Sequence, residues 1–172
     1  MQNPFDSFLA RVEKPAAWRE LRLEIEEFHH EYCNSLDAGR LLEWADYFTV
    51  DALYRVTGRE NADQGLPVGL VYCQGRGMLR DRARAIMETQ MFAPRYLLHS
   101  TSNTRVLSVA DGQIRAQANY FVWQTLVEGP TTLLQAGRYC DVFVREQDRL
   151  LLKRRDCVYD TELIANDLVY PV

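Results

Sequence analysis

The strongest constraint on the fold is a set of long alternating segments in the second half of the chain. Residues 95–160 contain four such segments of about 10 to 16 residues, rich in β-branched and aromatic side chains. Asp111-Gly112 suits a two-residue hairpin loop, and Gly129-Pro130 and the polar residues 145–148 separate the later segments. Because a typical strand has about five or six residues, these lengths predict a strongly curved antiparallel sheet.

Helical patterns fill the first half of the chain. Over residues 16–36, apolar side chains recur every three or four positions, which predicts an amphipathic helix. We expect a second helix over residues 38–48 with Asp37 as its N-cap, and a third over residues 77–90. Residues 52–57 predict a short strand. The apolar stripe of the first helix consists of Leu21, Ile25, Phe28, Tyr32 and Leu36.

Helices followed by an antiparallel meander predict an α+β fold, in which the helices pack in a curved, cone-shaped antiparallel sheet. The open mouth of such a cone is a natural pocket. Residues 58–69 carry three glycines and a proline and predict a loop. We expect one domain over residues 1–172, made of an N-terminal arm (1–15), a mainly helical part (16–90), the antiparallel sheet (95–160) and a C-terminal tail (161–172).

Composition narrows the class of protein. A net charge of −4 over 172 residues argues against nucleic acid or an anionic membrane as the main partner, since both need a basic surface. No apolar run approaches the roughly 20 residues of a membrane span, and the first residues do not resemble a secretory signal. We therefore expect a cytoplasmic protein whose four dispersed cysteines are buried free thiols.

The motifs of cofactor-dependent enzymes are missing from the sequence. No G-x-G-x-x-G opens a helix after a strand, and there is no P-loop and no G-x-S-x-G. The chain has three histidines, and the adjacent pair His29 and His30 would point about 100° apart on a helix. The sequence therefore predicts no metal or nucleotide cofactor in this chain.

Polar residues predicted near the cone interior leave two interpretations open. A carboxylate or imidazole as base and a tyrosine as hydrogen-bond donor are the elements of proton-transfer chemistry. In the alternative, Asp46 is exposed on its helix, His99 is a hydrogen-bonded sheet residue, and the other side chains pack with satisfied polar tips. The candidates are Asp46, Tyr54, His99, Asn119 and Arg138.

Arginines spaced along the first hairpin indicate a subunit interface. Arg95, Arg105 and Arg115 occur there, and arginine is favoured at interfaces because its planar fork pairs with carboxylates. In the segment 113–126, alternation places polar and large apolar residues on both faces of a strand. Neither face looks like plain core or plain solvent surface, so we expect an interface to cover the mixture.

Several segments resemble a known family. These are "EWADYFTVDALYRVT", "RYLLHSTSNTRV", the Asp-Gly turn, "AGRYCDVFV", "LLLKRRDCVYD" and the final "LVYPV". Together they are similar to the small, or β, subunit of aromatic-ring-hydroxylating oxygenases, over residues 24–172. The segment "YRVTGRENADQGLPVGLVYCQGRGMLRDR" most resembles the branch that acts on aromatic carboxylates, such as the small subunits of salicylate 5-hydroxylase and terephthalate dioxygenase, and we favour salicylate.

The resemblance implies a cone fold shared with nuclear transport factor two (a cystatin-like plan), scytalone dehydratase and ketosteroid isomerase. It also implies a non-catalytic subunit of an α3β3 oxidoreductase, a dioxygenase or monooxygenase of aromatic catabolism. The partner α subunit would carry a Rieske [2Fe–2S] cluster and mononuclear Fe(II), and NAD(P)H would act through separate ferredoxin and reductase components that meet that subunit. Interface candidates are Arg95, His99, Asn103, Arg105, Arg115 and Arg138.

Two rivals remain open at this point. One is a stand-alone isomerase or dehydratase that uses Asp46, Tyr54 or His99. The other is a small-ligand binding protein without chemistry. Turnover by the isolated chain and an accessible cone mouth would favour the enzyme, whereas the subunit hypothesis predicts neither.

Overall fold

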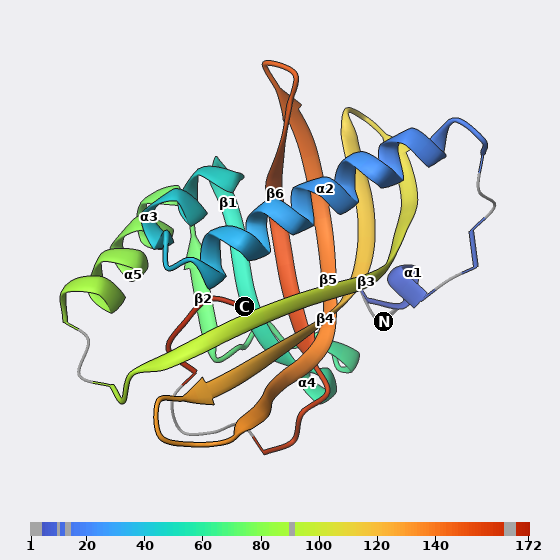
Figure 1. Ribbon diagram of the computed structural model, residues 1–172. Coiled ribbons are helices and arrows are strands. Elements are labelled where there is room, and N and C mark those ends of the chain that lie inside the picture. The colour runs from blue at the N-terminus through green and yellow to red at the C-terminus, as the bar shows by residue number, and fades with distance from the viewer. Residues whose placement is uncertain (1–4, 10, 13–14, 90–91, 164–167) are drawn as a thin grey trace.

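A single curved sheet of six strands, in the order β2-β1-β6-β5-β4-β3, organises the computed structural model (Figure 1). The structure describes residues 5–9, 11–12, 15–89, 92–163 and 168–172. The strands are β1 (Phe48–Gly58), β2 (Val71–Gln74), β3 (Arg95–Ala110), β4 (Gln113–Leu126), β5 (Thr131–Glu146) and β6 (Arg149–Tyr159). The helices are α1 (Asp6–Leu9), α2 (Trp18–Asp37), α3 (Leu41–Trp44), α4 (Arg59–Asp63) and α5 (Arg76–Glu88), with a 3₁₀ turn over Ala45–Tyr47.

The long strands β3 to β6 form the predicted antiparallel meander. Asp111 and Gly112 both have positive φ in the turn between β3 and β4, and Gln147 and Asp148 do the same between β5 and β6. Two consecutive residues of positive φ give a turn whose twist matches that of the flanking strands. The predicted hairpins are therefore confirmed.

The sheet is mixed rather than wholly antiparallel, because β1 pairs with β6 in parallel. Parallel neighbours need a long connection, and here the whole chain between β1 and β6 supplies it. The short strand β2 then adds to the other side of β1 in the antiparallel sense. The sequence predicts a sheet over residues 95–160 only. The predicted strand at 52–57 is part of the same sheet, as β1 between β2 and β6.

The helices confirm the predicted pattern with three differences. α2 and α5 lie where the periodicity places them, but the second helix is short and continues as the 3₁₀ turn. Asp37 is the last residue of α2 rather than an N-cap, and its carboxylate accepts hydrogen bonds from His99. The predicted loop 58–69 begins with the single-turn helix α4.

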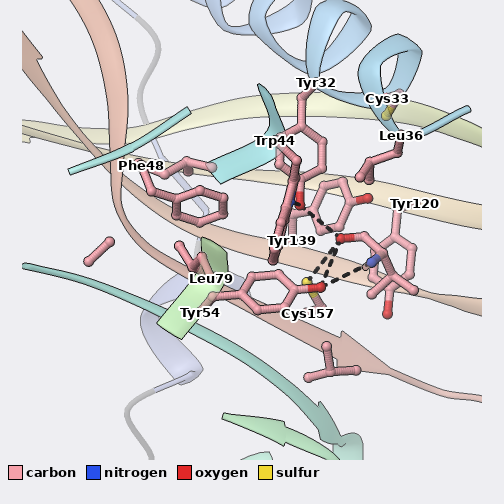
Figure 2. Close-up of a cluster of buried hydrophobic side chains, with 14 of the residues drawn as sticks. Tyr32, Cys33, Leu36, Trp44, Phe48, Tyr54, Leu79, Tyr120, Tyr139 and Cys157 are labelled. Atoms are coloured by element: carbon pink, nitrogen blue, oxygen red, sulfur yellow. Dashed lines mark hydrogen bonds between the residues drawn. The ribbon is translucent and has the colours of Figure 1, made fainter. Parts of the chain in front are cut away.

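α2 crosses one face of the sheet, and the main core lies between them (Figure 1). Figure 2 shows this core as a cluster of aromatic side chains from α2, α3, β1, β4 and β5. One face of β4 is buried there, so the prediction that both its faces are mixed is wrong for this face. Its residues are Ile114, Ala116, Ala118, Tyr120, Val122 and Gln124.

The described helices include none that is both long and apolar enough to cross a lipid bilayer. The predicted thiol chemistry is confirmed, since all four cysteines are free and buried. Burial raises the pKa of each thiol, which keeps them protonated and unreactive as nucleophiles.

Candidate functional site

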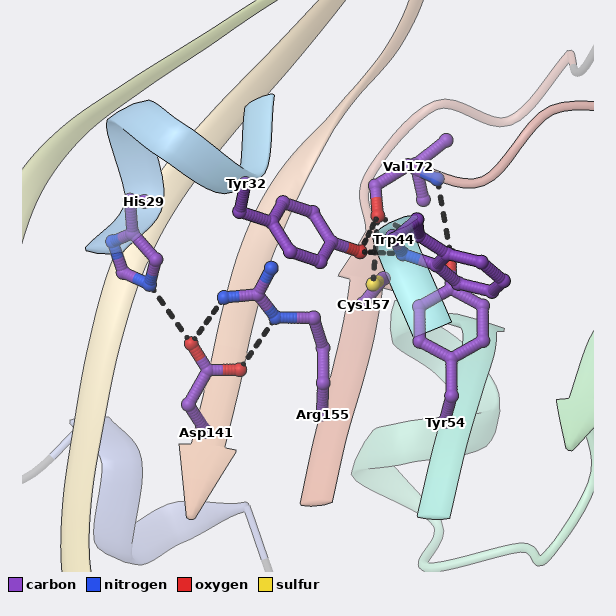
Figure 3. Close-up of polar contacts among 8 residues, drawn as sticks. All are labelled: His29, Tyr32, Trp44, Tyr54, Asp141, Arg155, Cys157 and Val172. Carbon is purple, nitrogen blue, oxygen red and sulfur yellow. Dashed lines mark hydrogen bonds and ion pairs between the residues drawn. The ribbon is translucent and has the colours of Figure 1, made fainter. Parts of the chain in front are cut away.

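A buried ion pair joins β5, β6 and α2 in the cone interior (Figure 3). Arg155 donates from Nε and Nη2 to the two carboxylate oxygens of Asp141, at 2.8 and 2.7 Å. Nε2 of His29 lies 3.0 Å from Asp141 Oδ2. All three side chains are inaccessible to solvent. The carboxylate therefore makes three hydrogen bonds, two with Arg155 and one with His29, and has no access to a diffusing substrate.

The charges of this trio follow from its surroundings. Burial opposes ionisation of Asp141, but the Arg155 guanidinium outweighs burial and holds the pKa of Asp141 below its usual value. For Arg155, burial likewise opposes the charge, and Asp141 outweighs it to raise the pKa. Burial dominates at His29 and lowers its pKa. We infer an ionised Asp–Arg pair and a neutral imidazole that donates through Nε2–H to Asp141.

The Arg155 guanidinium also lies between two tyrosine rings. Its carbon Cζ is 4.2 Å from the centroid of Tyr32 and 4.0 Å from that of Tyr139. A desolvated cation over aromatic faces gains about 2 kcal/mol or more in favourable cases. The network has the features of an organising core, because Arg155 and Asp141 neutralise each other away from solvent. Two of its buried atoms, Nδ1 of His29 and Nη1 of Arg155, have no hydrogen-bond partner among the described residues.

The segment Leu168–Val172, called the tail segment below, enters the mouth of the cone beside this network. The main-chain oxygen of Val172 accepts hydrogen bonds from the hydroxyls of Tyr32, at 3.0 Å, and Tyr54, at 3.2 Å. The Val172 N–H donates to the Tyr54 hydroxyl, and Trp44 Nε1–H donates to that of Tyr32. Burial raises the pKa of both tyrosines, so they remain neutral donors. Figure 3 shows these contacts converging on Val172.

His99 contacts the tail segment from the other side. Its Nδ1 lies 2.6 Å from Asp37 Oδ1, and its backbone N–H donates to the same carboxylate. Its Nε2 lies 3.3 Å from the main-chain oxygen of Pro171. His99 thus ties β3 to the end of α2 and to the tail segment.

The structure brings together only part of the predicted cone-interior set. Tyr54 and His99 both contact the tail segment, but the Asp46 side chain is 52% exposed and pairs with Arg80 at 2.8 Å outside the cone. Asn119 and Arg138 are cross-strand partners on the face of the sheet that points away from α2. Asp46, Tyr54 and His99 therefore do not form one acid–base site.

The predicted interface residues have partners within the chain. Arg95 bonds Gln124 at 2.8 Å, Arg105 bonds Gln117 at 3.3 Å, and Arg138 approaches Asp160 at 3.8 Å. Arg115 donates to Ser7 at 2.7 Å and lies 4.6 Å from the Phe8 ring centroid, so the N-terminal arm covers it. Asn103 has a φ of 55° at a β-bulge in β3.

Sequence reasoning missed the His29–Asp141–Arg155 network. For His29 a signal existed, because it follows Ile25 by four positions and precedes Tyr32 by three, within the helical stripe. The predicted apolar stripe contains Phe28 instead, but Phe28 is half-buried in the structure, whereas His29 is fully buried. Asp141 and Arg155 lie in strands rich in charge, and no spacing marks them as partners.

Large apolar side chains cover the other face of β3, β4 and β5. Leu98 lies opposite Trp123, and Trp123 lies opposite Leu133, so the three form a row across the strands. Tyr96 is 71% exposed and Leu98 61% exposed. We call this set the outer patch: Tyr96, Leu98, Phe121, Trp123 and Leu133. Soluble monomers rarely expose large contiguous apolar patches.

Within the part of the chain that the structure describes, no group of three or more His, Cys, Asp or Glu side chains is placed to hold a metal ion. The donor sets of a Rieske cluster or of a mononuclear iron centre do not fit these residues, since both need several His, Cys or carboxylate ligands around one point.

Comparison with known proteins agrees with this geometry. The family model of the SnoaL-like domain matches residues 19–156. The anthranilate 1,2-dioxygenase small subunit of Burkholderia cepacia is 37% identical over 149 residues, covering 87% of this chain and 92% of that protein. Subunit β 2 of the terephthalate 1,2-dioxygenase terminal oxygenase component from Comamonas sp. is 27% identical, covering 87% and 97%.

Comparison with a solved structure indicates the same family. A β subunit assigned to an aromatic-ring-hydroxylating dioxygenase of Novosphingobium aromaticivorans superposes with a TM-score of 0.80 at 36% identity, covering 90% of this chain and 97% of that chain. The fold is that of a SnoaL-like domain, a cone of curved sheet around N-terminal helices. Within that class, the chain belongs to the family of small, or β, subunits of aromatic-ring-hydroxylating dioxygenases.

Proposed function

We propose that this chain is the structural β subunit of a terminal oxygenase and that it holds an iron-bearing α subunit in an α3β3 complex. The 37% identity to an anthranilate dioxygenase small subunit over most of both chains carries this proposal. In it, the α subunit supplies the Rieske [2Fe–2S] cluster and the mononuclear Fe(II). NAD(P)H-derived electrons reach that subunit through separate ferredoxin and reductase components, and this chain supplies assembly.

Two surfaces support an assembly role. The outer patch exposes aromatic and aliphatic side chains, a composition that is enriched at the centres of interfaces. Arg105 lines a surface hollow together with Trp18, Arg19 and Arg22, which is suited to a carboxylate of a partner. We propose that Arg95, His99, Asn103, Arg105, Arg115 and Arg138 act in or beside these contacts by holding the strands that form them.

We propose an aromatic carboxylate such as salicylate as the substrate of the assembled enzyme. The matched relatives are named for anthranilate and terephthalate, which are both aromatic carboxylates. Salicylate, the hydroxyl counterpart of anthranilate, is the substrate that the sequence favours. The rival stand-alone isomerase or dehydratase has less support, because the tail segment occupies the cone mouth and Asp46 lies outside it.

The test is co-expression of a tagged form of this chain with its α subunit. The proposal predicts that the α subunit co-purifies with its iron, and that the complex consumes O₂ with salicylate or anthranilate when electron-transfer components are added. An α subunit that is fully assembled and equally active without this chain would contradict the assembly role. Consumption of neither salicylate nor anthranilate by the fully assembled complex would contradict the proposed substrate.

A further inference from the structure

The tail segment fills a position that is built like a ligand site. The hydrogen bonds of Tyr32 and Tyr54 to Val172, and the approach of His99 to Pro171, converge from α2, β1 and β3 on two successive main-chain oxygens. Pro171 and Val172 are both buried. A segment of this chain, rather than a side chain of the cone, therefore occupies the mouth.

The walls of this position are aromatic. Trp44 and Tyr54 meet edge-to-face at 5.2 Å between ring centroids, and Phe48 lies edge-to-face against both. Figure 2 shows these rings gathered with Tyr32 around one region of the core. Aromatic walls with a few convergent polar groups are typical of small-molecule sites.

The polar groups suit an anion. The tyrosine hydroxyls and the His99 ring present hydrogen-bond donors to oxygen, and the buried Arg155 guanidinium lies against the Tyr32 ring. Asp141, the carboxylate inside the cone, is already paired with Arg155, and Asp37 is paired with His99. A small aromatic carboxylate matches both the donors and the walls.

We propose that the cone mouth is a carboxylate-binding site that the tail segment occupies, and that withdrawing this segment lets a small aromatic carboxylate bind among Tyr32, Tyr54 and His99. This inference does not depend on the assembly role, because it concerns the isolated chain. One further contact holds the tail segment from outside the site: Arg82 of α5 donates to the main-chain oxygen of Val169 at 2.8 Å.

The experiment measures benzoate binding by calorimetry to the unchanged chain, to a chain without residues 168–172, and to Arg82→Ala. The proposal predicts that both variants bind benzoate at least about tenfold more tightly than the unchanged chain, as expected when a competing occupant is released. A peptide of sequence LVYPV should compete with benzoate for the shortened chain. Benzamide, which has the same size but no charge, should bind more weakly.

The Arg82→Ala chain keeps the test decisive if the shortened chain does not fold, since it retains every group that lines the site. Tyr54→Phe, added to the shortened chain or to Arg82→Ala, should weaken benzoate binding about tenfold. This is the effect of losing one hydrogen bond to a charged group. A folded variant with a released tail segment that binds benzoate no better than the unchanged chain would overturn the proposal. Binding that neither the peptide nor Tyr54→Phe affects would overturn it as well.

Discussion

At the scale of single residues, the interior of this cone depends on charges that neutralise one another. Asp141 and Arg155 form a bidentate pair without solvent access, and His29 adds a third hydrogen bond. Removing either Asp141 or Arg155 leaves the other charged in a medium of low polarity, whereas removing both leaves no buried charge in the network. The contributions of these three residues to folding stability are therefore strongly coupled.

We predict that Arg155→Met lowers the free energy of unfolding by about 3–5 kcal/mol, because Asp141 is then buried without a counter-charge. The double variant Arg155→Met with Asp141→Leu should recover most of this loss. Chemical denaturation of the three proteins measures the coupling. Equal loss in the single and double variants would show that packing, not charge, makes Arg155 necessary.

The pKa of His29 gives a prediction about pH. Burial lowers this pKa in the folded chain, so as pH falls below about 6.5 the unfolded chain binds a proton that the folded chain does not. Stability must then fall with decreasing pH, with a slope of up to about 1.4 kcal/mol per pH unit from this group.

His29→Gln keeps an amide that can donate to Asp141 and removes the titrating ring. We expect denaturation curves between about pH 6.5 and 5 to show a smaller loss of stability in this variant than in the unchanged chain. His30 is exposed on the same helix, so His30→Gln is the matched control and should keep the original slope. Identical slopes in all three proteins would contradict a buried, neutral His29.

At the scale of elements, the contact of β5 with β6 leaves no room for a side chain at Gly137. A Cβ atom there would collide with the backbone of Val158 and Tyr159 in the neighbouring strand. Backbone cannot give way as a flexible side chain can. The close pairing of these two strands therefore requires the absence of a side chain at Gly137.

We predict that Gly137→Ala destabilises the chain by about 1–3 kcal/mol, the usual cost of overpacking, or more if the strands separate. Gly77 lies in α5 with open space around its Cβ position, so Gly77→Ala should be neutral or stabilising by up to about 1 kcal/mol. Thermal melts of both variants check this. Equal melting temperatures for Gly137→Ala and the unchanged chain would show that the strands adjust.

The elements also show where the sequence is informative. Strand length and the Asp-Gly turn predict the meander, since both are local properties of the chain. The parallel pairing of β1 with β6 joins segments about 100 residues apart, and no local pattern encodes it. No local pattern predicts the contact of His99 with Asp37 or that of the tail segment with Tyr54 either, because the fold brings these residues together from distant parts of the chain.

The two faces of β4 show a further reason why burial does not follow from residue type alone. Gln124 and Tyr120 made the inner face look mixed, yet both are buried, and Tyr120 donates to Gln135 at 2.6 Å. A polar group that finds a partner inside the core is indistinguishable in sequence from one that faces solvent. The outer face, with Phe121 and Trp123 exposed, is the one whose composition fits an interface.

At the scale of the whole molecule, the outer patch is available for assembly. We predict that Trp123→Asp weakens association with the α subunit or with other copies of this chain at least about a hundredfold, because it places an unpaired charge at the centre of the patch. Arg105→Ala should weaken it by about 2–5 kcal/mol if its guanidinium meets a partner carboxylate.

The control for this prediction is Tyr72→Asp. Tyr72 is also an exposed aromatic residue but lies on β2, at the opposite end of the sheet. Size-exclusion chromatography with light scattering measures assembly, and a melt of each lone subunit checks its fold. Loss of assembly in Tyr72→Asp but not in Trp123→Asp would move the interface away from the outer patch.

The mass of the complex tests the central claim most directly. This chain and its α subunit, co-expressed and purified together, should give a native mass spectrum with the two chains in equal numbers and a total that corresponds to three of each. Trp123→Asp should shift that spectrum towards free subunits. A chain that remains a monomer at every concentration and does not bind the α subunit would contradict its proposed role as the structural subunit of an oxygenase.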